Sequence, residues 1–263
     1  MKQTKATVVS NIEILPGGPH RAGWALSGHL MRLRCPKIAS EAKPGQFIMV
    51  RCGDENFLPR PFSVHESAKG TIVLFFAVLE GGKGSQWLSK QQVNETIEVF
   101  GPLGNGFSIL PSTNNILLIA GGMGLAPLCF LAQQAVREKR SVTLLLGSAI
   151  GPLYSERPGN LLPPEINIAT ATNDGSKGHH GMVTDLIPKY IDWADQVFAC
   201  GPVAMYKTMA QMSELKGKSV QISLEIMMGC GMGVCYGCTI RTKKGLKQVC
   251  KDGPVFEMGE VEK

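Results

Sequence analysis

Short apolar runs separated by glycine and proline dominate the first hundred residues of the chain. Each run has the length of a β-strand, and a further strand is expected to begin at Arg60-Pro61-Phe62-Ser63. Several short strands at this spacing predict an N-terminal β-domain, either a small barrel or a sandwich. The runs cover residues 6–9, 47–51, 71–78 and 96–100.

The pattern changes near Asn115, where apolar runs begin to alternate with glycine-rich turns and longer helical stretches. This alternation is typical of βαβ units and therefore predicts a parallel sheet. In order, the segments are an apolar run at 116–120, the turn Gly121-Gly122-Met123-Gly124, a helix at 125–138, an apolar run at 142–146, an apolar run at 196–199, the turn Cys200-Gly201-Pro202 and a helix at 203–212.

The chain has 263 residues, which is enough for two ordinary domains with cores of their own. We expect the β-domain at 1–111 and the α/β domain at 112–222. The remaining segment, 223–263, is too short and too rich in cysteine to form a third hydrophobic core. It is expected to be an appendage stabilised by a bound metal.

Composition excludes several classes of protein. Apolar residues make up 44% of the chain and charged residues 18%, and the longest apolar run, 116–131, is interrupted by glycines and Pro127. No stretch of about 18 apolar residues is available to span a bilayer, and the N-terminus lacks a secretory signal, so we expect a cytoplasmic location without membrane association. The net charge of +6 is scattered along the chain, which argues against a nucleic-acid partner.

Four of the eight cysteines lie close together near the C-terminus, as Cys230-x4-Cys235-x2-Cys238 followed after eleven residues by Cys250. Plant-type ferredoxins hold a 2Fe-2S cluster with this opening and a distant fourth cysteine. Thiolates also bind zinc, but structural zinc sites usually pair their cysteines as two short knuckles. The spacing therefore favours a 2Fe-2S cluster over zinc, disulfides or unrelated buried thiols.

Glycines surround these cysteines at positions 229, 231, 233 and 237. Glycine lets the backbone approach a cluster closely and direct N–H groups toward its sulfurs, which supports the cluster hypothesis. The isolated Cys35, Cys52 and Cys129 are instead expected to be small buried hydrophobic residues.

Two loops of the predicted α/β domain have the context of a nucleotide site. Gly121-Gly122-Met123-Gly124 lies between a strand and a helix, where backbone amides can receive a pyrophosphate, although it is not the G-x-G-x-x-G fingerprint. Cys200-Gly201-Pro202 follows another strand, at the sheet edge where such folds bind ligands. A tight turn without any ligand is the alternative for each loop.

Two segments of the β-domain could contact a phosphorylated ligand. Arg60 stands beside the hydroxyl of Ser63 and could hold the phosphate or ring edge of a flavin, although an arginine before proline is more often a surface residue. The segment 81–86, with sequence GGKGSQ, is either a phosphate loop or a flexible turn. These residues alone leave both alternatives open.

Taken together and in order, the motifs resemble the ferredoxin reductase superfamily, and more narrowly the electron-transfer subunits of type B dihydroorotate dehydrogenases. The narrower resemblance rests on the C-terminal position of the cysteine cluster and its tail. The matching pieces are Arg60-Pro61-Phe62-Ser63, Gly84-Ser85 with Leu88, Gly101-Pro102-Leu103-Gly104, Gly121-Gly122-Met123-Gly124-Leu125-Ala126-Pro127, Cys200-Gly201-Pro202, Ser223-Leu224-Glu225 and Val249-Cys250-Lys251-Asp252-Gly253-Pro254-Val255-Phe256.

The resemblance implies an antiparallel β-barrel that binds flavin, a parallel-sheet α/β domain that binds NAD, and a small C-terminal 2Fe-2S lobe. It also implies which residues contact each cofactor. For FAD these are Arg60, Pro61, Phe62, Ser63, Ala77, Val78, Leu79, Gly84 and Ser85; for NAD they are Gly121, Gly122, Gly124, Cys200 and Gly201; for the cluster they are Cys230, Cys235, Cys238 and Cys250.

In activity, the resemblance implies an oxidoreductase subunit in pyrimidine biosynthesis. A separate FMN-containing catalytic subunit would oxidise dihydroorotate to orotate, and electrons would pass through the cluster and FAD to NAD, in a heterotetramer of two catalytic and two electron-transfer subunits. This fits the chain, in which no base or nucleophile is poised for substrate chemistry, because the cofactors perform the redox steps.

The sequence leaves other functions open. The chain could be a subunit of a related NAD(P)H-ferredoxin reductase, a sulfide dehydrogenase or a hydrogenase, or a non-enzymatic metal-binding or redox-sensing protein. Two stretches depart from the family pattern: residues 16–23 resemble an insertion, and residues 148–154 offer no acidic side chain to bind a ribose. The preference for NAD over NADP is therefore implied by the resemblance alone.

Overall fold

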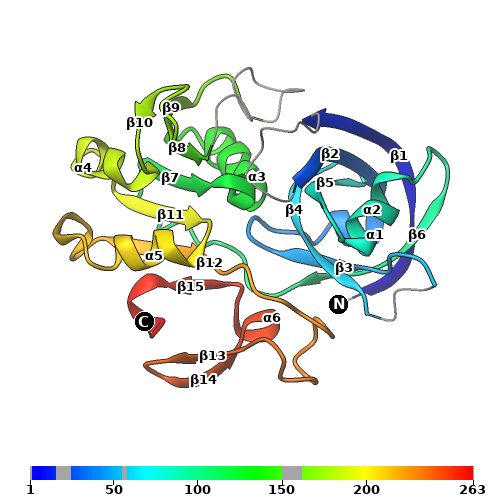
Figure 1. The fold of residues 1–263 in the computed structure, drawn as a ribbon. Helices are drawn as coiled ribbons and strands as arrows, with labels where there is room; N and C mark the ends of the chain where they lie inside the picture. The colour runs from blue at the N-terminus through cyan, green and yellow to red at the C-terminus, as the bar shows by residue number, and fades with distance from the viewer. Residues whose placement is uncertain (1, 16–24, 55–57, 150–161, 263) are drawn as a thin grey trace.

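The computed structural model describes residues 2–15, 25–54, 58–149 and 162–262 (Figure 1). The stretch 16–23, and residues 150–154 of the stretch 148–154, lie outside these ranges. No helix within them combines the length and the apolar character needed to cross a bilayer.

The N-terminal part is a closed antiparallel β-barrel with strand order β1-β2-β5-β4-β3-β6 (Figure 1). Of the two expected alternatives, the barrel is therefore confirmed. Helix α1 (Pro36–Ala39) follows β2, and helix α2 (Lys83–Ser89) follows β5. The barrel strands are β1 (Lys2–Leu15), β2 (Ala25–Arg34), β3 (Phe47–Val50), β4 (Arg60–Ala68), β5 (Thr71–Leu79) and β6 (Thr96–Leu103).

The middle of the chain forms a largely parallel sheet, ordered β10-β9-β8-β7-β11-β12-β15. Five of the junctions are parallel, as the alternating pattern predicts, and β15 joins β12 in antiparallel orientation. The strands are β7 (Asn115–Gly121), β8 (Ser141–Ser148), β9 (Asn167–Thr172), β10 (His179–His180), β11 (Gln196–Cys200), β12 (Ser219–Ser223) and β15 (Val255–Glu257).

Helices cover both faces of this sheet, which explains why its central strands are continuously apolar. Along β7, Ile116 and Leu118 pack with α3 (Leu125–Arg137) on one face. Leu117 and Ile119 pack on the other face, against α5 (Val203–Met209). Shorter helical turns complete this face: η3 (Val183–Leu186), α4 (Ile187–Tyr190) and η4 (Ser213–Leu215). The turn η1 (Gly122–Gly124) leads into α3, and its Met123 packs on the α3 face.

The C-terminal segment is a small lobe below the sheet and beside the barrel (Figure 1). It contains a two-stranded hairpin, a short helix and a terminal turn: β13 (Thr239–Thr242), β14 (Gly245–Gln248), α6 (Val249–Asp252) and η5 (Met258–Glu260). The lobe is not isolated from the rest, because β15 pairs with the last parallel strand and barrel residues Phe47 and Met49 enter the lobe's apolar core.

Two buried glutamines on the sheet hold the segment 104–114, which connects the barrel to the sheet and is called the connection below. Gln196 on β11 is fully buried, its side-chain oxygen accepts the amide of Leu110 at 3.0 Å, and its nitrogen donates to the carbonyl of Ser108 at 2.9 Å. Gln221 on β12 accepts the amide of Ser108 at 2.9 Å. These bonds satisfy backbone groups of the connection that would otherwise be buried without partners.

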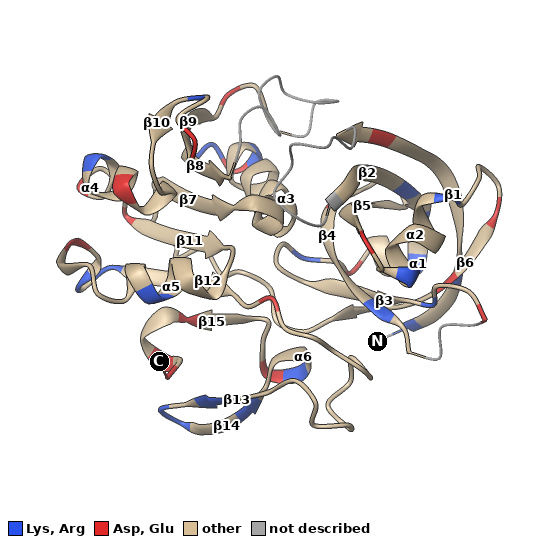
Figure 2. Ribbon diagram, viewed as in Figure 1, with Lys and Arg blue, Asp and Glu red and all other residues tan. Residues whose placement is uncertain are grey.

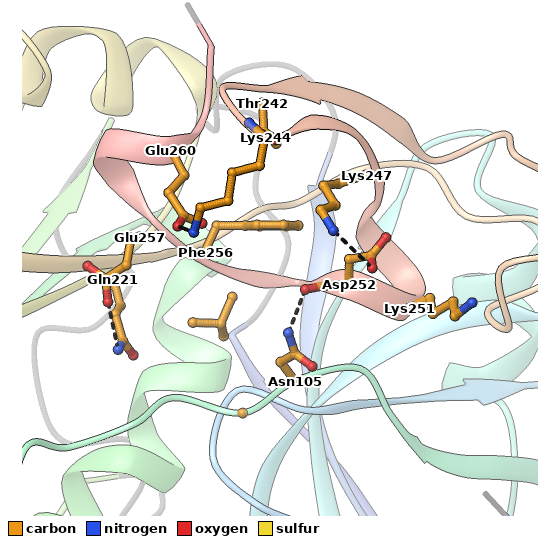
Figure 3. Close-up of a pocket in the computed structure, with 12 residues that line it drawn as sticks. Asn105, Gln221, Thr242, Lys244, Lys247, Lys251, Asp252, Phe256, Glu257 and Glu260 are labelled. Atoms are coloured by element: carbon orange, nitrogen blue, oxygen red, sulfur yellow. Dashed lines mark hydrogen bonds and ion pairs between the residues drawn. The ribbon is translucent and has the colours of Figure 1, made fainter.

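A polar cavity of about 430 Å³ lies where the connection, the sheet and the C-terminal lobe converge (Figure 3). The Gln221 side chain donates to Glu257 at 3.0 Å, Lys247 pairs with Asp252 at 3.7 Å, and the side chain of Asn105 donates to the Asp252 carbonyl. Lysines and carboxylates are equally numerous in its described lining. We interpret the cavity as a joint between the three parts.

His65 links the barrel directly to the sheet. Its side chain on β4 is 1% exposed, and its Nδ1 lies 3.2 Å from the carbonyl oxygen of Ala126 in the first turn of α3. A carbonyl only accepts, so Nδ1 carries a proton and donates it to this oxygen. Burial lowers the pKa of His65 to about 4, against the opposing influence of this hydrogen bond.

We expect this histidine to make the folded state sensitive to acid. A folded-state pKa below the unfolded value means that the unfolded chain binds the extra proton first, so stability falls as the pH drops from about 6.5 toward 4. By pH 5 the loss attributable to His65 is about 2 kcal/mol. Denaturant unfolding at pH 7.5 and pH 5 measures it, with His65→Gln as the variant that cannot be charged. An equal loss in both proteins would show that His65 is not the cause.

Candidate functional site

The four clustered cysteines lie on one loop and the short helix that follows the hairpin. Cys230 is half-buried and Cys235 is exposed, whereas Cys238 and Cys250 are each 2% exposed. Backbone amides point at three of the sulfurs: Met232 donates to Cys230 at 3.4 Å, Gly233 to Cys250 at 3.1 Å, and Cys250 itself to Cys238 at 3.4 Å.

The environments of these thiols differ. Burial acts to raise the pKa of Cys230, but hydrogen bonds from the amides of Met232, Cys235 and Val234 outweigh it and lower that pKa to about 6. Burial raises the pKa of Cys250 to about 12, and the adjacent Cys238 sulfur acts in the same direction. Cysteines bind metals as thiolates. Cys230 is therefore largely deprotonated at neutral pH before a metal binds, whereas Cys250 must lose its proton on binding.

The arrangement fits a binuclear cluster. Cys230 interacts with Cys235, and Cys250 interacts with both Cys238 and Cys230, so the four thiols form one group. Two thiolates for each of two irons is the ligand set of a 2Fe-2S cluster.

At one of the surrounding positions, only glycine leaves room for the cysteine loop to lie against the barrel. Gly231 has a φ of +70°, and a Cβ atom there would lie 2.5 Å from Cγ of Met49 on β3. A side chain at this position would therefore push the cysteine loop away from the barrel. Cβ atoms at Gly229 or Gly237 would lie 3.6 Å from the sulfur of Cys235, which is an ordinary contact, so these positions are less constrained.

The lone cysteines behave as expected. Cys35, Cys52 and Cys129 are all buried in hydrophobic clusters. Burial raises the pKa of Cys35 and of Cys52 to about 11, which keeps both thiols protonated and unreactive at neutral pH.

A cavity of about 350 Å³ lies between the barrel, the sheet and the C-terminal lobe. It is lined by many of the residues expected to contact FAD and by apolar side chains of the segment that leads to Cys230. The expected residues in its lining are Pro61, Phe62, Ser63, Ala77 and Leu79, and Cys200 also lines it. Val78 instead points into the barrel core and is 5% exposed.

Arg60, Gly84 and Ser85 gather at one end of this group. A Cβ atom on Gly84 would lie 3.0 Å from Cγ of Arg60, so the absence of a side chain lets α2 approach the arginine. The Ser85 hydroxyl accepts the amide of Leu79 at 3.1 Å, and Arg60 donates to the carbonyl of Leu58 at 2.6 Å. Residues 83–86 of the segment 81–86 are helical, because α2 begins at Lys83, and contact of this segment with a phosphate stays a prediction.

Arg60 is expected to be the main charged contact of the flavin phosphates. Removing a charge-assisted hydrogen bond typically costs about 1.5–3 kcal/mol, so Arg60→Ala should weaken FAD binding about 10- to 100-fold. Fluorescence titration of the apoprotein with FAD measures this. Arg51→Ala is the matched control, since Arg51 lies on the same barrel and pairs with Asp54 at 3.3 Å. Equal affinities for the two variants would remove Arg60 from the flavin site.

A second cavity, of about 530 Å³, opens at the carboxyl ends of the parallel strands. Gly121 and Gly122 line it together with Gly147, Ser148 and Pro202. This is the edge at which open α/β sheets bind ligands, and its size suits part of a dinucleotide.

Two other expected nucleotide residues shape this cavity without lining it. A Cβ atom on Gly124 would lie 2.0 Å from the carbonyl oxygen of Cys200, so glycine lets the start of α3 approach β11. The amide of Gly201 donates to the hydroxyl of Tyr206 at 2.8 Å, and that hydroxyl donates to the carbonyl of Ser223 at 2.6 Å. Their roles in nucleotide binding remain predictions.

Glu225 is a functional candidate to which the sequence analysis assigned no role. It belongs to the motif Ser223-Leu224-Glu225, one of the pieces that match the ferredoxin reductase superfamily. It lines both cavities, and its carboxylate accepts a hydrogen bond from the thiol of Cys200 at 3.7 Å. Burial raises the pKa of Glu225, although the Cys200 hydrogen bond opposes the shift. An ionisable carboxyl group therefore lies at the boundary between the two cavities.

Comparison with known proteins agrees with this geometry. Residues 26–107 match the model of an oxidoreductase FAD-binding domain, and residues 225–262 match the iron–sulfur cluster binding domain of dihydroorotate dehydrogenase B. The chain is 36% identical to the dihydroorotate dehydrogenase B (NAD(+)) electron transfer subunit of Desulforamulus reducens, over 89% of this chain and 92% of that protein. The chain belongs to this family. The electron transfer subunit of a Geobacillus species is also 36% identical, over 99% of both chains.

Solved structures share the fold beyond the dihydroorotate dehydrogenase B electron transfer family. An NADH-dependent reduced ferredoxin-NADP oxidoreductase, studied for flavin-based electron bifurcation, matches with a TM-score of 0.82 and 27% identity, over 98% of this chain and 89% of that one. A ferredoxin NADP+ reductase from Neisseria gonorrhoeae with bound FAD and NADP matches with a TM-score of 0.63 and 18% identity, over 80% and 90%. The expected fold class, an FAD-binding domain and an iron–sulfur cluster binding domain are thereby confirmed.

Proposed function

We propose that this chain is the electron-transfer subunit of an NAD-linked dihydroorotate dehydrogenase in pyrimidine biosynthesis. Its partner would be a catalytic subunit that contains FMN, in a heterotetramer of two subunits of each kind. Oxidation of dihydroorotate to orotate releases two electrons and two protons. NAD+ takes both electrons and one proton to become NADH, and the other proton goes to solvent.

The observation that supports this proposal is that the cavity proposed for FAD adjoins both the cavity proposed for NAD and the segment that leads to the cysteine cluster. The cavity proposed for FAD is bordered by Phe62 from the barrel, Cys200 from the sheet and Met228 from the segment before the cysteine cluster. Glu225 joins this cavity to the one proposed for NAD. We assign residues 1–111 to FAD, 112–222 to NAD and 223–263 to the cluster.

When bound, FAD can exchange a hydride with nicotinamide and single electrons with an iron–sulfur cluster, and this chain's residues provide the arrangement that such chemistry needs. Arg60 and Ser63 would bind and orient the flavin. Cys230, Cys235, Cys238 and Cys250 would hold the cluster.

The exposed side of the cluster lobe is the proposed docking face for the catalytic subunit. Met227 is 92% exposed, Val234 67% and Tyr236 70%, all on the loop that carries the exposed Cys235. Lysines and arginines of the adjacent hairpin β13–β14 form a basic margin (Figure 2). Apolar centres with a charged rim are typical of protein interfaces.

The proposal is tested by mixing the purified holo-chain with a type B catalytic subunit. It predicts a complex whose mass corresponds to two copies of each subunit, and NADH formation that requires dihydroorotate and both proteins. Reversing charges at Lys243 and Lys244 together should weaken the complex. Absence of a complex together with absence of NADH formation would contradict the proposal.

The structural similarity to the ferredoxin-NADP oxidoreductase favours one second candidate, a reductase subunit that exchanges electrons with ferredoxin. The same preparation distinguishes the two functions. Reduction of ferredoxin by NAD(P)H without any catalytic subunit would support the second candidate.

A further inference from the structure

The cavity proposed for FAD and the inner cysteine thiols, Cys238 and Cys250, share apolar side chains in their surroundings. Phe47, Leu224, Ile226 and Met228 line that cavity, and all four also belong to the packed cluster that contains Cys238 and Cys250. We call these four residues the shared wall. Because the wall belongs to both sites, its packing sets how closely their contents approach.

Strand β3 supplies the most buried part of the shared wall. Phe47 and Met49 point toward the lobe, while Ile48 and Val50 alternate with them and point into the barrel core, as strand geometry requires. Phe47 is 3% exposed and Met49 fully buried, and Met49 packs against Gly231 beside the ligand Cys230. One face of this strand thus contacts both the cavity and the cysteine loop.

We propose that Phe47 is a positioning residue for electron transfer between flavin and cluster, an inference that rests on the proposed function. Its ring fixes the spacing across the shared wall and keeps water away from Cys238 and Cys250. For each dihydroorotate oxidised and each NAD+ reduced to NADH, two electrons cross this wall. The apolar surroundings of a metal site control its solvent access and thereby its reduction potential.

Phe75 offers a matched control on the same cavity. It is also 3% exposed and lines the same space, but it packs with the α3 side of the molecule rather than with the thiols. Truncating either ring enlarges the cavity by a similar volume. Only truncation of Phe47 opens the wall toward the cluster.

The test is a potentiometric titration of the holo-chain, followed by the electron paramagnetic resonance signal of the cluster. Phe47→Ala should shift the cluster potential upward, because water near the thiols favours the state with one more negative charge. Phe75→Ala should leave the potential unchanged. Phe47→Leu, which keeps an apolar group, should show a smaller shift in the same direction and serves if the alanine variant does not fold.

Equal shifts for the Phe47 and Phe75 variants, or an unchanged potential in both Phe47 variants, would overturn the inference. Flavin and iron contents are measured on every sample. Wild-type chain that carries no flavin or no cluster would instead overturn the proposed function, so the two failures are distinguishable.

Discussion

Cys250→Ala is expected to yield a chain that keeps FAD but loses its iron and sulfide. Cys250 is one of two inner thiols, and it also donates its amide to the sulfur of Cys238. With three cysteines left, one iron of a 2Fe-2S cluster lacks a ligand, and the cluster is not held. Because metal binding and folding are coupled in small metal-bound segments, the lobe should also become accessible to protease.

Cys35→Ala is the control for this experiment. Cys35 is 2% exposed, as is Cys250, but it lies in the barrel core, where its replacement removes a small buried side chain and no ligand. Iron and acid-labile sulfide analysis of both variants measures the effect. Retention of iron by Cys250→Ala, or its loss from both variants, would contradict the assignment of Cys250 as a ligand.

Glu225→Gln should impair the reaction with NAD+ while leaving FAD and the cluster in place. Glu225 lines both cavities, where its carboxylate can stabilise a positively charged nicotinamide. Loss of one such charged contact costs about 1.5–3 kcal/mol, which corresponds to a decrease of about 10- to 100-fold in kcat/KM for NAD+.

The pH dependence provides a second readout for Glu225. Because burial raises its pKa, the wild-type rate should start to fall with decreasing pH at a higher pH than an ordinary glutamate would give, and the glutamine variant should lack this fall. Steady-state rates with NAD+ between pH 5 and 8 test this. Glu214→Gln, on an exposed turn of the same domain, is the control. Identical pH profiles for wild type and Glu225→Gln would exclude the proposed role.

The elements that the sequence predicts best are those buried on both faces. The apolar run at 116–120 and the helix at 125–138 correspond to β7 and α3 within about one residue at each end. Strand β2 is not among the apolar runs because Arg32 and Arg34 alternate with Met31 and Leu33, which makes it a half-buried strand rather than a continuous apolar run. The predicted helix at 203–212 is too long, since α5 ends at Met209.

The features that the sequence does not predict depend on contacts between residues far apart in the chain. Nothing in the spacing of residues 255–257 predicts that they pair with β12, because a three-residue strand is specified by its partner. Glu225 was not assigned as a site residue for the same reason: its proximity to Cys200 depends on how β11 and the segment after β12 are placed. The cysteine spacing, by contrast, is a local signal, and it indicates the cluster directly.

The account is tested most directly by the cofactor content of the chain purified without oxygen. Visible absorption, with flavin, iron and acid-labile sulfide measured against protein, should show FAD and a 2Fe-2S cluster in equimolar amounts with the chain. Zinc in place of iron, or a chain without flavin, would contradict the central claim that flavin and cluster lie on one electron path.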